Sequence, residues 1–467
     1  MEFITNQIDW INNLLWSYIV IILLLGLGLF FTIQTKCVQF RYFFEMIKLM
    51  TENIGRGRNK KKISSFQAFC ISAASRVGTG NLAGVAIAIS SGGPGAVFWM
   101  WLIALIGGAS SFIESTLAQI YKVHDGKENF RGGPAYYMEK ALKKRWLGVI
   151  FALLIAFTYG FAFNATQANT IAGACEKAFG FKPLYVGIVL SALTGAVIFG
   201  GIKRIADISS TIVPIMAGLY VICVLYVVVS NITLIPKIFM MIFESAFGIK
   251  QFFGGTVGGA IMLGVKRGLF SNEAGMGSAP NAAAAAHTSH PVKQGLIQTL
   301  GVFFDTILIC SATAFVVLTY AAEGHTEITE SGIQLTQTAL QAHIPGAHIF
   351  VAVCVFLFAW SSVIGNYSYG ETNLAFLTEH KIYLYFFRIL AIGFVLLGSV
   401  ASLDTVWAFA DLCMGLMAII NMIAIAGLSG IAIKALKDYQ KQKKAGKDPL
   451  FTKDAIPEIK NDLACWD

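Results

Sequence analysis

Charged residues are scarce in this chain: they make up 13% of its 467 residues, while 56% are hydrophobic and the mean hydropathy is +0.67. A soluble domain carries about a quarter charged residues. A chain this apolar cannot place its surface in water, so lipid must be its solvent. The formal net charge of +9 does not indicate nucleic-acid binding, because the basic residues lie in short segments between apolar runs.

Several motifs are also missing. The chain has no GxxxxGK(S/T) loop for nucleotide phosphates, which argues against an ATP-driven pump, and no HExxH, GxSxG or paired catalytic cluster, so we expect no enzymatic activity. The eight cysteines stand singly, without metal-ligand spacing, and we interpret them as small apolar core residues. The N-terminal stretch MEFITNQIDW has no basic segment, so we expect the first apolar run to stay in the protein rather than be cleaved.

Long apolar runs dominate what is present, and a membrane-spanning helix needs about 20 such residues. Eleven runs can be marked, at residues 13–35, 66–90, 95–121, 146–172, 183–200, 207–230, 256–286, 294–322, 346–371, 382–402 and 404–433. Helices are expected because a lipid-exposed backbone must satisfy its own hydrogen bonds, and the alternating pattern of a membrane barrel is absent. The sequence predicts an all-α polytopic membrane protein with 11 transmembrane helices. Two further stretches, 131–140 and 334–343, are expected to lie on the surface or to be partly inserted.

The basic residues between the runs predict the orientation. With the N-terminus outside, the segments that face the cytoplasm hold 27 Lys and Arg residues and the outer loops hold 4. Cytoplasmic loops carry such an excess. We therefore predict a multi-pass protein of the inner (plasma) membrane with its N-terminus outside. Residues 434–467 are predicted to form a basic cytoplasmic tail, which we expect to be loosely ordered.

Glycines interrupt two of the runs, in SRVGTGNLAG at 75–84 and SNEAGMGSAP at 271–280. Each glycine weakens a helix by about 1 kcal/mol relative to alanine. Both stretches hold a G-x-G with a charged residue two positions ahead, Arg76 in one and Glu273 in the other. In lipid, such irregular backbone is tolerated only where it lines a cavity or a site. Exposed amides suit a carboxylate, and exposed carbonyls suit a cation.

Each break opens a block of five runs, residues 66–230 and 256–433, after a first helix within residues 1–35. Because five is odd, the second block starts from the opposite side of the membrane. Matching interrupted helices in two inverted halves indicate the binding site of a transporter. The alternative, that small residues only allow close helix packing, explains one break more easily than two in register.

Four stretches resemble the alanine/glycine:cation symporter family: SRVGTGNLAG, GGPAYYM at 132–138, KRGLFSNEAGMGSAPNAAA at 266–284 and GNYSYGE at 365–371. The similarity runs from about residue 60 to residue 430. It implies the leucine-transporter-like fold of two inverted five-helix repeats, preceded by one extra helix. It also implies secondary active transport, the sodium-coupled symport of a small neutral amino acid by alternating access. The alternatives are a proton-coupled symporter and a channel. In the leading interpretation the coupling ion is sodium, and no other cofactor is expected.

The resemblance implies one sodium site between the first and eighth core helices. Its ligands would be the carbonyl oxygens of Ala74, Val77 and Phe358 and the hydroxyls of Ser361 and Ser362. Mixed oxygen ligands suit a hard cation. Ordinary hydrogen bonding between helices is the alternative role of the two serines.

For the substrate, the resemblance implies the backbone of both G-x-G motifs with neighbouring polar side chains. The candidate residues are Gly78, Thr79, Gly80, Asn81, Asn164, Gln167, Asn272, Gly275, Met276, Gly277, Ser362 and Asn366. Asn164 and Gln167 belong to a polar patch inside an apolar run, which the membrane interior disfavours unless its groups meet partners. Polar contacts between helices are the alternative role of this patch.

One position departs from the family pattern. The family usually has tryptophan where this chain has Asn366, and that tryptophan helps to close a pocket for alanine or glycine. Asparagine is smaller and forms hydrogen bonds, so glutamine or asparagine becomes a plausible substrate.

Charged residues inside the runs are functional candidates by default. We interpret Arg76 and Glu273 as near-site or gating charges. For most of the others we expect pairing or a position at a helix end: Glu114, Lys266, Arg267, Asp305, Arg388 and Asp411.

Overall fold

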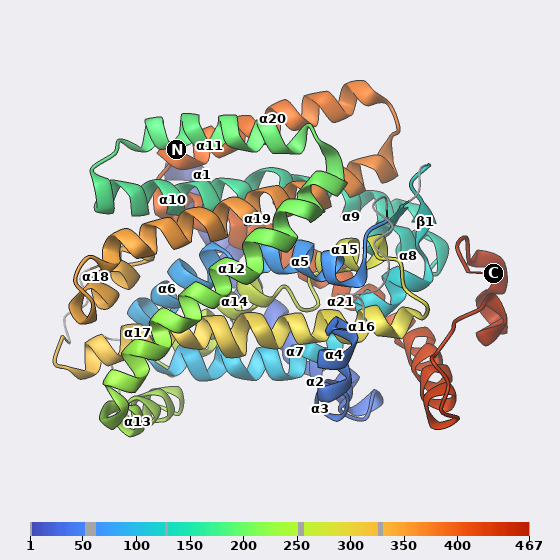
Figure 1. Cartoon of the computed structure of the whole chain (residues 1–467), viewed down its shortest axis with the longest axis horizontal. Helices are drawn as coiled ribbons and strands as arrows, with labels where there is room; N and C mark the ends of the chain where they lie inside the picture. The colour runs from blue at the N-terminus through green and yellow to red at the C-terminus, as the bar shows by residue number, and fades with distance from the viewer. Residues whose placement is uncertain (1, 52–61, 127–128, 251–255, 326–329, 467) are drawn as a thin grey trace.

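The computed structural model describes residues 2–51, 62–126, 129–250, 256–325 and 330–466. Within them the chain forms helices that run side by side along the long axis of the molecule (Figure 1). The short strands β1 (Val123–His124) and β2 (Phe130–Arg131) pair in an antiparallel hairpin. Apart from this hairpin, the prediction of a helical protein is confirmed for the described residues.

Eight helices in the described residues are long and apolar enough to cross a membrane. They are α1 (Glu2–Leu14) with η1 (Leu15–Ile19) and α2 (Val20–Gln34), α7 (Gly95–Ile120), α9 (Arg145–Phe157) with η3 (Thr158–Ala162) and α10 (Phe163–Phe179), α12 (Gly201–Ser230), α16 (Pro291–Val302) with η5 (Phe303–Cys310) and α17 (Ser311–Ala322), α19 (Ala347–Leu377), α20 (Lys381–Val400) and α21 (Leu403–Lys444). Helix α11 (Pro183–Ile198) and both interrupted helices are shorter. The count of eleven spans and the inverted repeat stay predictions.

Both predicted breaks are present as interruptions of a helix. Helix α5 (Ser65–Arg76) ends at Val77, and the chain continues as a π-helical turn, η2 (Gly80–Gly84), and α6 (Val85–Gly92). Helix α14 (Val257–Asn272) ends at Glu273, whose φ of 58° is left-handed, and α15 (Ala279–Ala285) follows. Glycine tolerates the left-handed backbone of the second break, where residues 275 and 277 both have a φ of 87°.

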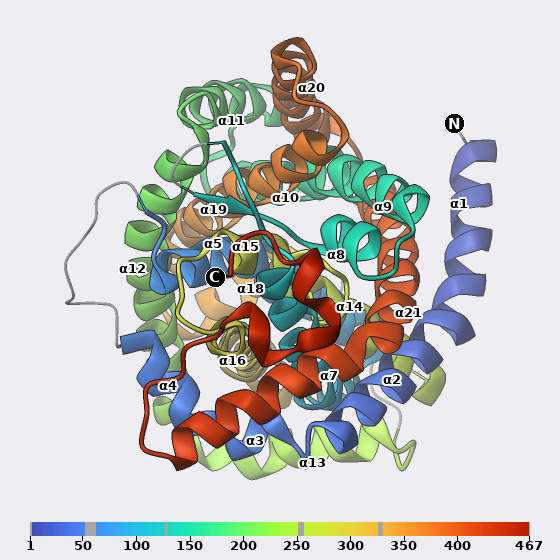
Figure 2. The same ribbon diagram turned by 90° about the vertical axis from the view of Figure 1, so that its right-hand side faces the viewer.

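The interrupted helices lie in the interior of the bundle. Viewed along its axis, α5, α14, α15 and α16 are near the centre, and α1, α11, α12, α20 and α13 (Ile235–Ala246) lie around the edge (Figure 2). Helix α7 packs against both α14 and α16, and α5 packs against α12 and α19. The polar groups of both breaks are therefore shielded from lipid.

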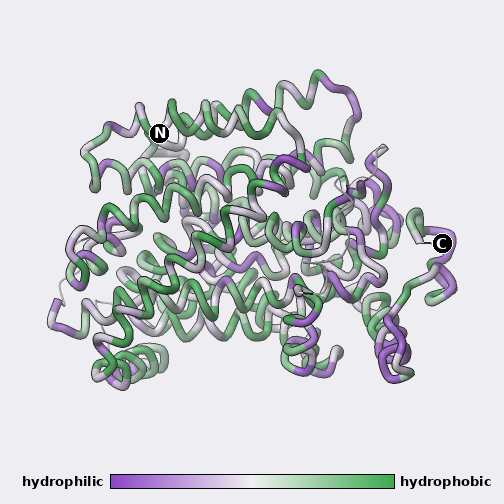
Figure 3. Tube along the Cα trace, in the orientation of Figure 1, coloured by the Kyte–Doolittle hydropathy of each residue, from purple (hydrophilic) through white to green (hydrophobic). Residues whose placement is uncertain are grey.

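Short helices lie at the two ends of the bundle. Helices α3 (Val38–Arg41), α4 (Phe43–Thr51) and α8 (Pro134–Lys140) lie at one end, and α18 (Ile333–His343) lies at the other (Figure 1). Hydrophilic residues gather near α4 and in the C-terminal tail (Figure 3). The N-terminus and the tail lie at opposite ends (Figure 1), which agrees with an odd number of membrane crossings.

The C-terminal tail packs against the bundle instead of being loosely ordered, so that expectation was wrong. Helix α21 continues to Lys444, and the tail buries Phe451, Ile456 and Trp466. The Trp466 Nε1 donates a hydrogen bond to the Gln119 carbonyl oxygen at 3.1 Å. These apolar side chains are scattered through a basic segment, so composition did not reveal that they share one buried face.

No two cysteines form a disulfide among the described residues, and five of the eight are buried. Their interpretation as core residues is therefore confirmed for those five. It is wrong for Cys37, which is exposed, whereas Cys223 and Cys465 are half-buried.

Candidate functional site

Carbonyl and hydroxyl oxygens from α5 and α19 meet at the first break. The Ser362 hydroxyl lies 2.7 Å from the Ala74 carbonyl oxygen and 3.4 Å from that of Val77. It also lies 3.1 Å from the Phe358 carbonyl oxygen, to which the Ser361 hydroxyl donates at 2.8 Å. One hydroxyl has one hydrogen, so Ser362 cannot satisfy three carbonyl oxygens fully. The residues predicted to bind sodium thus lie together, while the ion contact itself stays a prediction.

Close approach explains the glycines of the first break. A Cβ at Gly78 would lie 2.2 Å from the Ser362 Oγ and 2.7 Å from the Gln167 Oε1. A Cβ at Gly80 would lie 3.1 Å from the Cα of Ser271, at the end of α14. A side chain does not fit at the Gly78 distances, and at Gly80 it would fit only if the neighbouring backbone shifted. The G-x-G therefore lets the first break lie against α10, α19 and the second interrupted helix.

Neutral side chains hold the amides of the first break. The Thr79 N–H donates to the Gln167 Oε1 at 2.9 Å, and the Gly78 N–H donates to the Asn81 Oδ1 at 2.9 Å. The Asn81 Nδ2 in turn donates to the Asp305 Oδ1 at 2.6 Å. A carboxamide can release a backbone amide to a stronger, charged acceptor, because hydrogen bonds to ionised groups are about twice as strong.

A carboxylate of the protein itself holds the amides of the second break. The Gly275 and Gly277 N–H groups donate to the two oxygens of Glu114, each at 3.1 Å. The Asn421 Nδ2 donates to the Glu114 Oε2 at 2.8 Å and to the Gly275 carbonyl oxygen at 2.9 Å. Glu114 is fully buried on α7. In this structure the amides of Gly275 and Gly277 are thus bonded to Glu114, and their contact with substrate stays a prediction.

Glu273 links the second break to the first. The Ser75 hydroxyl lies 2.9 Å from the Glu273 Oε1 and 2.6 Å from the Asn366 Oδ1. The Ser278 hydroxyl donates to the Glu273 Oε2 at 2.7 Å. A left-handed conformation costs a residue other than glycine about 1–2 kcal/mol. These hydrogen bonds offset that cost and fix the turn at which α14 ends.

Four predicted substrate residues keep a buried polar atom without a hydrogen-bond partner in the described part of the chain. The atoms are the Thr79 Oγ1, Asn164 Oδ1, Asn272 Nδ2 and Asn366 Nδ2. A buried polar group without a partner costs about 1–3 kcal/mol. These donors and acceptors are what a polar ligand would satisfy.

Other predicted residues have hydrogen-bond partners outside the two breaks. The Arg76 Nη1 donates to the Gln298 carbonyl oxygen at 3.1 Å on α16, and no ion pair joins Arg76 to Glu273 among the described residues. The Asn164 Nδ2 donates to the Gly160 carbonyl oxygen of its own helix at 3.2 Å. Met276 is buried with its sulfur 4.0 Å from the Tyr159 hydroxyl.

The expected pairing of intramembrane charges is confirmed for several residues. Asp411 pairs with Arg267 at 2.5 Å and with Lys266 at 3.4 Å. Arg388 pairs with Glu371 at 3.4 Å. Glu114 and Asp305 differ, because their hydrogen-bond partners among the described residues are neutral groups. Asp305 accepts from the Ser271 hydroxyl at 2.6 Å and from Asn81.

Sequence reasoning did not single out Ser75, Ser271 or Asn421. Two of them lie inside the glycine-rich stretches, so the position of a hydroxyl next to a break was an available signal. Asn421 lies in the last apolar run, 146 residues from Gly275, and no local pattern marks it. Glu114 was visible only as a lone carboxylate in an apolar run.

Comparison with known proteins gives the same class of protein at several levels of similarity. A family model described as "Sodium:alanine symporter family" matches residues 1–453. An amino-acid carrier protein, AlsT of Bacillus subtilis, is 55% identical over 461 residues, covering 98% of this chain and 97% of the relative. A probable sodium/glutamine symporter, GlnT of the same organism, is 53% identical and covers 97% of this chain and 94% of its own length.

More distant proteins extend the comparison from sequence to fold. The sodium/alanine symporter AgcS of Methanococcus maripaludis is 39% identical, covering 95% of this chain and 99% of the relative. The crystal structure of MhsT in complex with L-phenylalanine superimposes with a TM-score of 0.53 at 13% identity, covering 81% of this chain and 98% of MhsT. That likeness places the described helices in a leucine-transporter-like arrangement.

Proposed function

Because this chain belongs to the sodium:alanine symporter family, we propose that it carries a small neutral amino acid across the plasma membrane together with sodium. The family and the fold support secondary amino-acid transport. The proposal adds the coupling ion, the substrate class and the residues that bind them. It also includes eleven spans in two inverted five-helix repeats, with the N-terminus outside and the tail in the cytoplasm.

The main observation that supports sodium coupling is the oxygen cluster at the first break. Carbonyl oxygens of Ala74, Val77 and Phe358 surround the Ser362 hydroxyl within 3.4 Å. The set contains no nitrogen donor and no carboxylate, so it suits a small hard monovalent cation better than a transition metal. A sodium ion would coordinate all these oxygens at once, whereas a single hydroxyl hydrogen cannot bond to all of them.

For the substrate, we propose a position between the two breaks. The Gln167 carboxamide would release the Thr79 amide to the carboxylate of the amino acid. The unpartnered Thr79 Oγ1 and Asn272 Nδ2 would satisfy its remaining polar atoms. Glu114 would keep the amides of Gly275 and Gly277 in place while the substrate binds.

The identity of the amino acid depends on Asn366. One similar protein is named for alanine and another for glutamine. Asn366 is 1% exposed, and its Nδ2 has no partner among the described residues. We propose that this carboxamide widens the pocket and donates to the side chain of a larger polar substrate, so that glutamine or asparagine competes with alanine and glycine.

One pocket supports a proposed route of access from the outer side. A pocket of about 220 Å³ is lined by Asn169 and Thr170 of α10 together with Ser331 and Gln334 near α18. Asn169 lies two residues beyond Gln167 on α10. We propose that this pocket belongs to the outer half of an alternating-access route between the two repeats.

Uptake by proteoliposomes tests this function. An imposed inward sodium gradient should drive accumulation of labelled alanine or glutamine, and replacement of sodium by choline at constant pH should abolish it. Undiminished uptake in choline with a proton gradient would favour the proton-coupled alternative. Substrate flux without counterflow exchange would identify a channel.

A further inference from the structure

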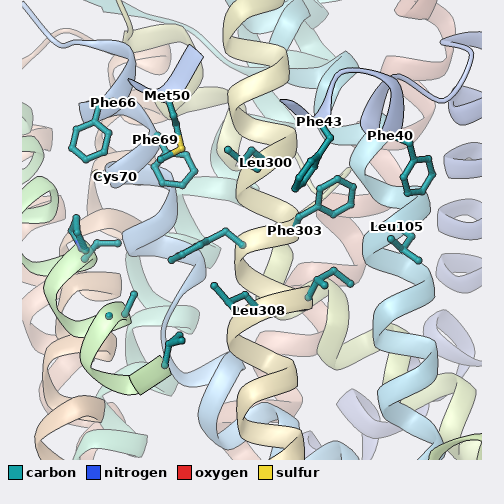
Figure 4. A pocket seen from close by; sticks show the side chains of 17 residues that line it. Phe40, Phe43, Met50, Phe66, Phe69, Cys70, Leu105, Leu300, Phe303 and Leu308 are labelled. Atoms are coloured by element: carbon teal, nitrogen blue, oxygen red, sulfur yellow. The ribbon is translucent and has the colours of Figure 1, made fainter. Parts of the chain in front are cut away.

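A groove of about 840 Å³ is lined by side chains from several helices of the bundle (Figure 4). Its walls come from α3, α4, α5, α7, α12, α16 and η5. All of its 17 lining side chains are apolar or, in one case, a thiol. Phenylalanine dominates on one wall, with Phe40 and Phe43 from the short helices and Phe303 from η5.

The groove opens toward lipid. Pro214 and Gly218, on the spanning helix α12, are exposed and line it, and Ile307 of η5 is 38% exposed. A Cβ built on Gly218 meets no atom within 4 Å. The hollow therefore continues into the space that the hydrocarbon of the bilayer fills.

The lining decides what kind of molecule fits. A free amino acid would leave its charged groups without partners in these walls, at a cost of several kcal/mol. A hydrocarbon chain has no such groups and gains close packing against the phenylalanines. The groove is thus suited to an acyl chain and unsuited to the transported substrate.

Positive charge lies beside the groove at the end of the bundle that carries α4. Three exposed basic residues lie within four positions of a lining residue: Arg41 next to Phe40, Lys48 near Met50 and Lys62 near Phe66. The described acid of α4, Glu45, is engaged elsewhere, because its Oε1 pairs with Lys443 of α21 at 2.6 Å. The exposed charges that neighbour these lining residues in the chain are therefore positive.

We propose that this groove binds one acyl chain of an anionic phospholipid, whose headgroup phosphate lies at Lys48 and Lys62. Basic residues next to spanning helices attract anionic headgroups by about 1 kcal/mol each. At 1.4 kcal/mol per tenfold, each lysine contributes about fivefold in affinity. The bound chain contacts Phe69 and Cys70 of α5, one to two turns before the carbonyl of Ala74.

Native mass spectrometry of the full chain released from detergent micelles tests the proposal. The probes are phosphatidylglycerol and phosphatidylethanolamine of equal chain length, added to delipidated protein. We expect one phosphatidylglycerol to remain bound at concentrations at which phosphatidylethanolamine does not. Lys48→Gln with Lys62→Gln should weaken its retention about 25-fold. Lys182→Gln with Lys381→Gln, exposed lysines at the starts of α11 and α20, neither of which lines the groove, should leave it unchanged.

A substitution that fills the groove tests the chain-binding part. Gly218→Trp should reduce phosphatidylglycerol retention at least tenfold, because the indole occupies the hollow. Leu219→Trp is the matched control, since Leu219 is 50% exposed on the same helix and does not line the groove. Thermal unfolding of both variants in lipid-free detergent shows whether each one folds.

Three results would overturn the proposal. The first is equal retention of the two lipids by the unmodified protein. The second is unchanged retention in folded Gly218→Trp protein. The third is a dimer mass that Gly218→Trp abolishes, which would assign the groove to a second copy of the chain. None of these readouts depends on which solute is transported.

Discussion

At the first break, the free backbone groups that matter are carbonyl oxygens, and at the second they are amides. The carbonyls of Ala74 and Val77 lie around a single hydroxyl, that of Ser362. The amides of Gly275 and Gly277 each reach a full carboxylate oxygen of Glu114. Both breaks hold a G-x-G after a charged residue. At the first break the carbonyl oxygens share too few hydrogen-bond donors, whereas at the second break the amides are satisfied by a carboxylate of the protein itself.

The difference indicates a division of labour. A break whose carbonyl oxygens share too few hydrogens is ready for a cation, and its neutral carboxamide partners can be displaced. A break whose amides are tied to a buried carboxylate is held in shape. We expect changes at the second break to affect folding first, and changes at the first break to affect ligand binding first.

Glu114→Ala should have the largest effect. It leaves two buried N–H groups and the Asn421 carboxamide without their acceptor, and each such loss costs about 1–3 kcal/mol. Over the three groups, the expected loss in free energy of unfolding is about 3–9 kcal/mol, measured by thermal unfolding in detergent. Glu379→Ala removes an exposed carboxylate that pairs with Arg131 and should change stability by less than about 1 kcal/mol. A Glu114→Ala protein as stable as this control would refute the structural role of Glu114.

Ser362→Ala should impair sodium binding next, with little change in stability. The hydroxyl lies within 3.4 Å of three carbonyl oxygens, and its removal takes a ligand from the proposed site. A charge-assisted contact is worth about 1.5–3 kcal/mol, so the sodium concentration for half-maximal uptake should rise about ten- to a hundredfold. The same variant with unaltered sodium dependence would place the ion elsewhere.

Asn366→Trp should change which amino acid competes best. An indole is far larger than a carboxamide, and overpacking a filled site costs about 1–3 kcal/mol. That predicts roughly five- to a hundredfold discrimination against glutamine relative to alanine. Competition assays on the wild type and the variant measure it. An identical ranking of alanine, glycine and glutamine in both would show that Asn366 does not face the substrate.

Ser361→Ala should have the smallest effect of the series. Its hydroxyl donates to one carbonyl oxygen, that of Phe358 in its own helix, at 2.8 Å. We expect the half-maximal sodium concentration to rise about two- to tenfold, less than in Ser362→Ala, while substrate affinity at saturating sodium stays the same. Sodium titration of uptake in both variants checks the order, and a reversed order would contradict the geometry of the cluster.

Much of the fold could be predicted from the sequence, because lipid imposes a simple rule on long apolar segments. The runs between residues 13 and 433 correspond to helices, and two helices are interrupted at the glycine-rich stretches, as the sequence predicts. The extension of α21 to Lys444 could not be predicted from hydropathy, since its last turns are basic. The packing of the tail depends on Trp466 and Phe451, whose partners lie far away in the sequence.

The sequence predicted which residues form the candidate site better than it predicted the hydrogen bonds between them. Ser362 and Ala74 are 288 residues apart, and only the family resemblance brought them together. The partner of the second break could not be predicted, because Glu114 lies on α7 in a run with no local sign of its role. Likewise, nothing near Asn366 shows that the Ser75 hydroxyl lies 2.6 Å away.

Sodium-dependent thermal stabilisation of the purified protein tests the central claim most directly. An ion that binds only the folded state raises its stability by RT ln(1 + [L]/Kd). We predict that sodium chloride raises the unfolding temperature of the wild type, that choline chloride at equal concentration does not, and that Ser362→Ala loses the sodium effect. Equal sodium-dependent shifts in the wild type and in Ser362→Ala would contradict the assignment of the cation site to the first break.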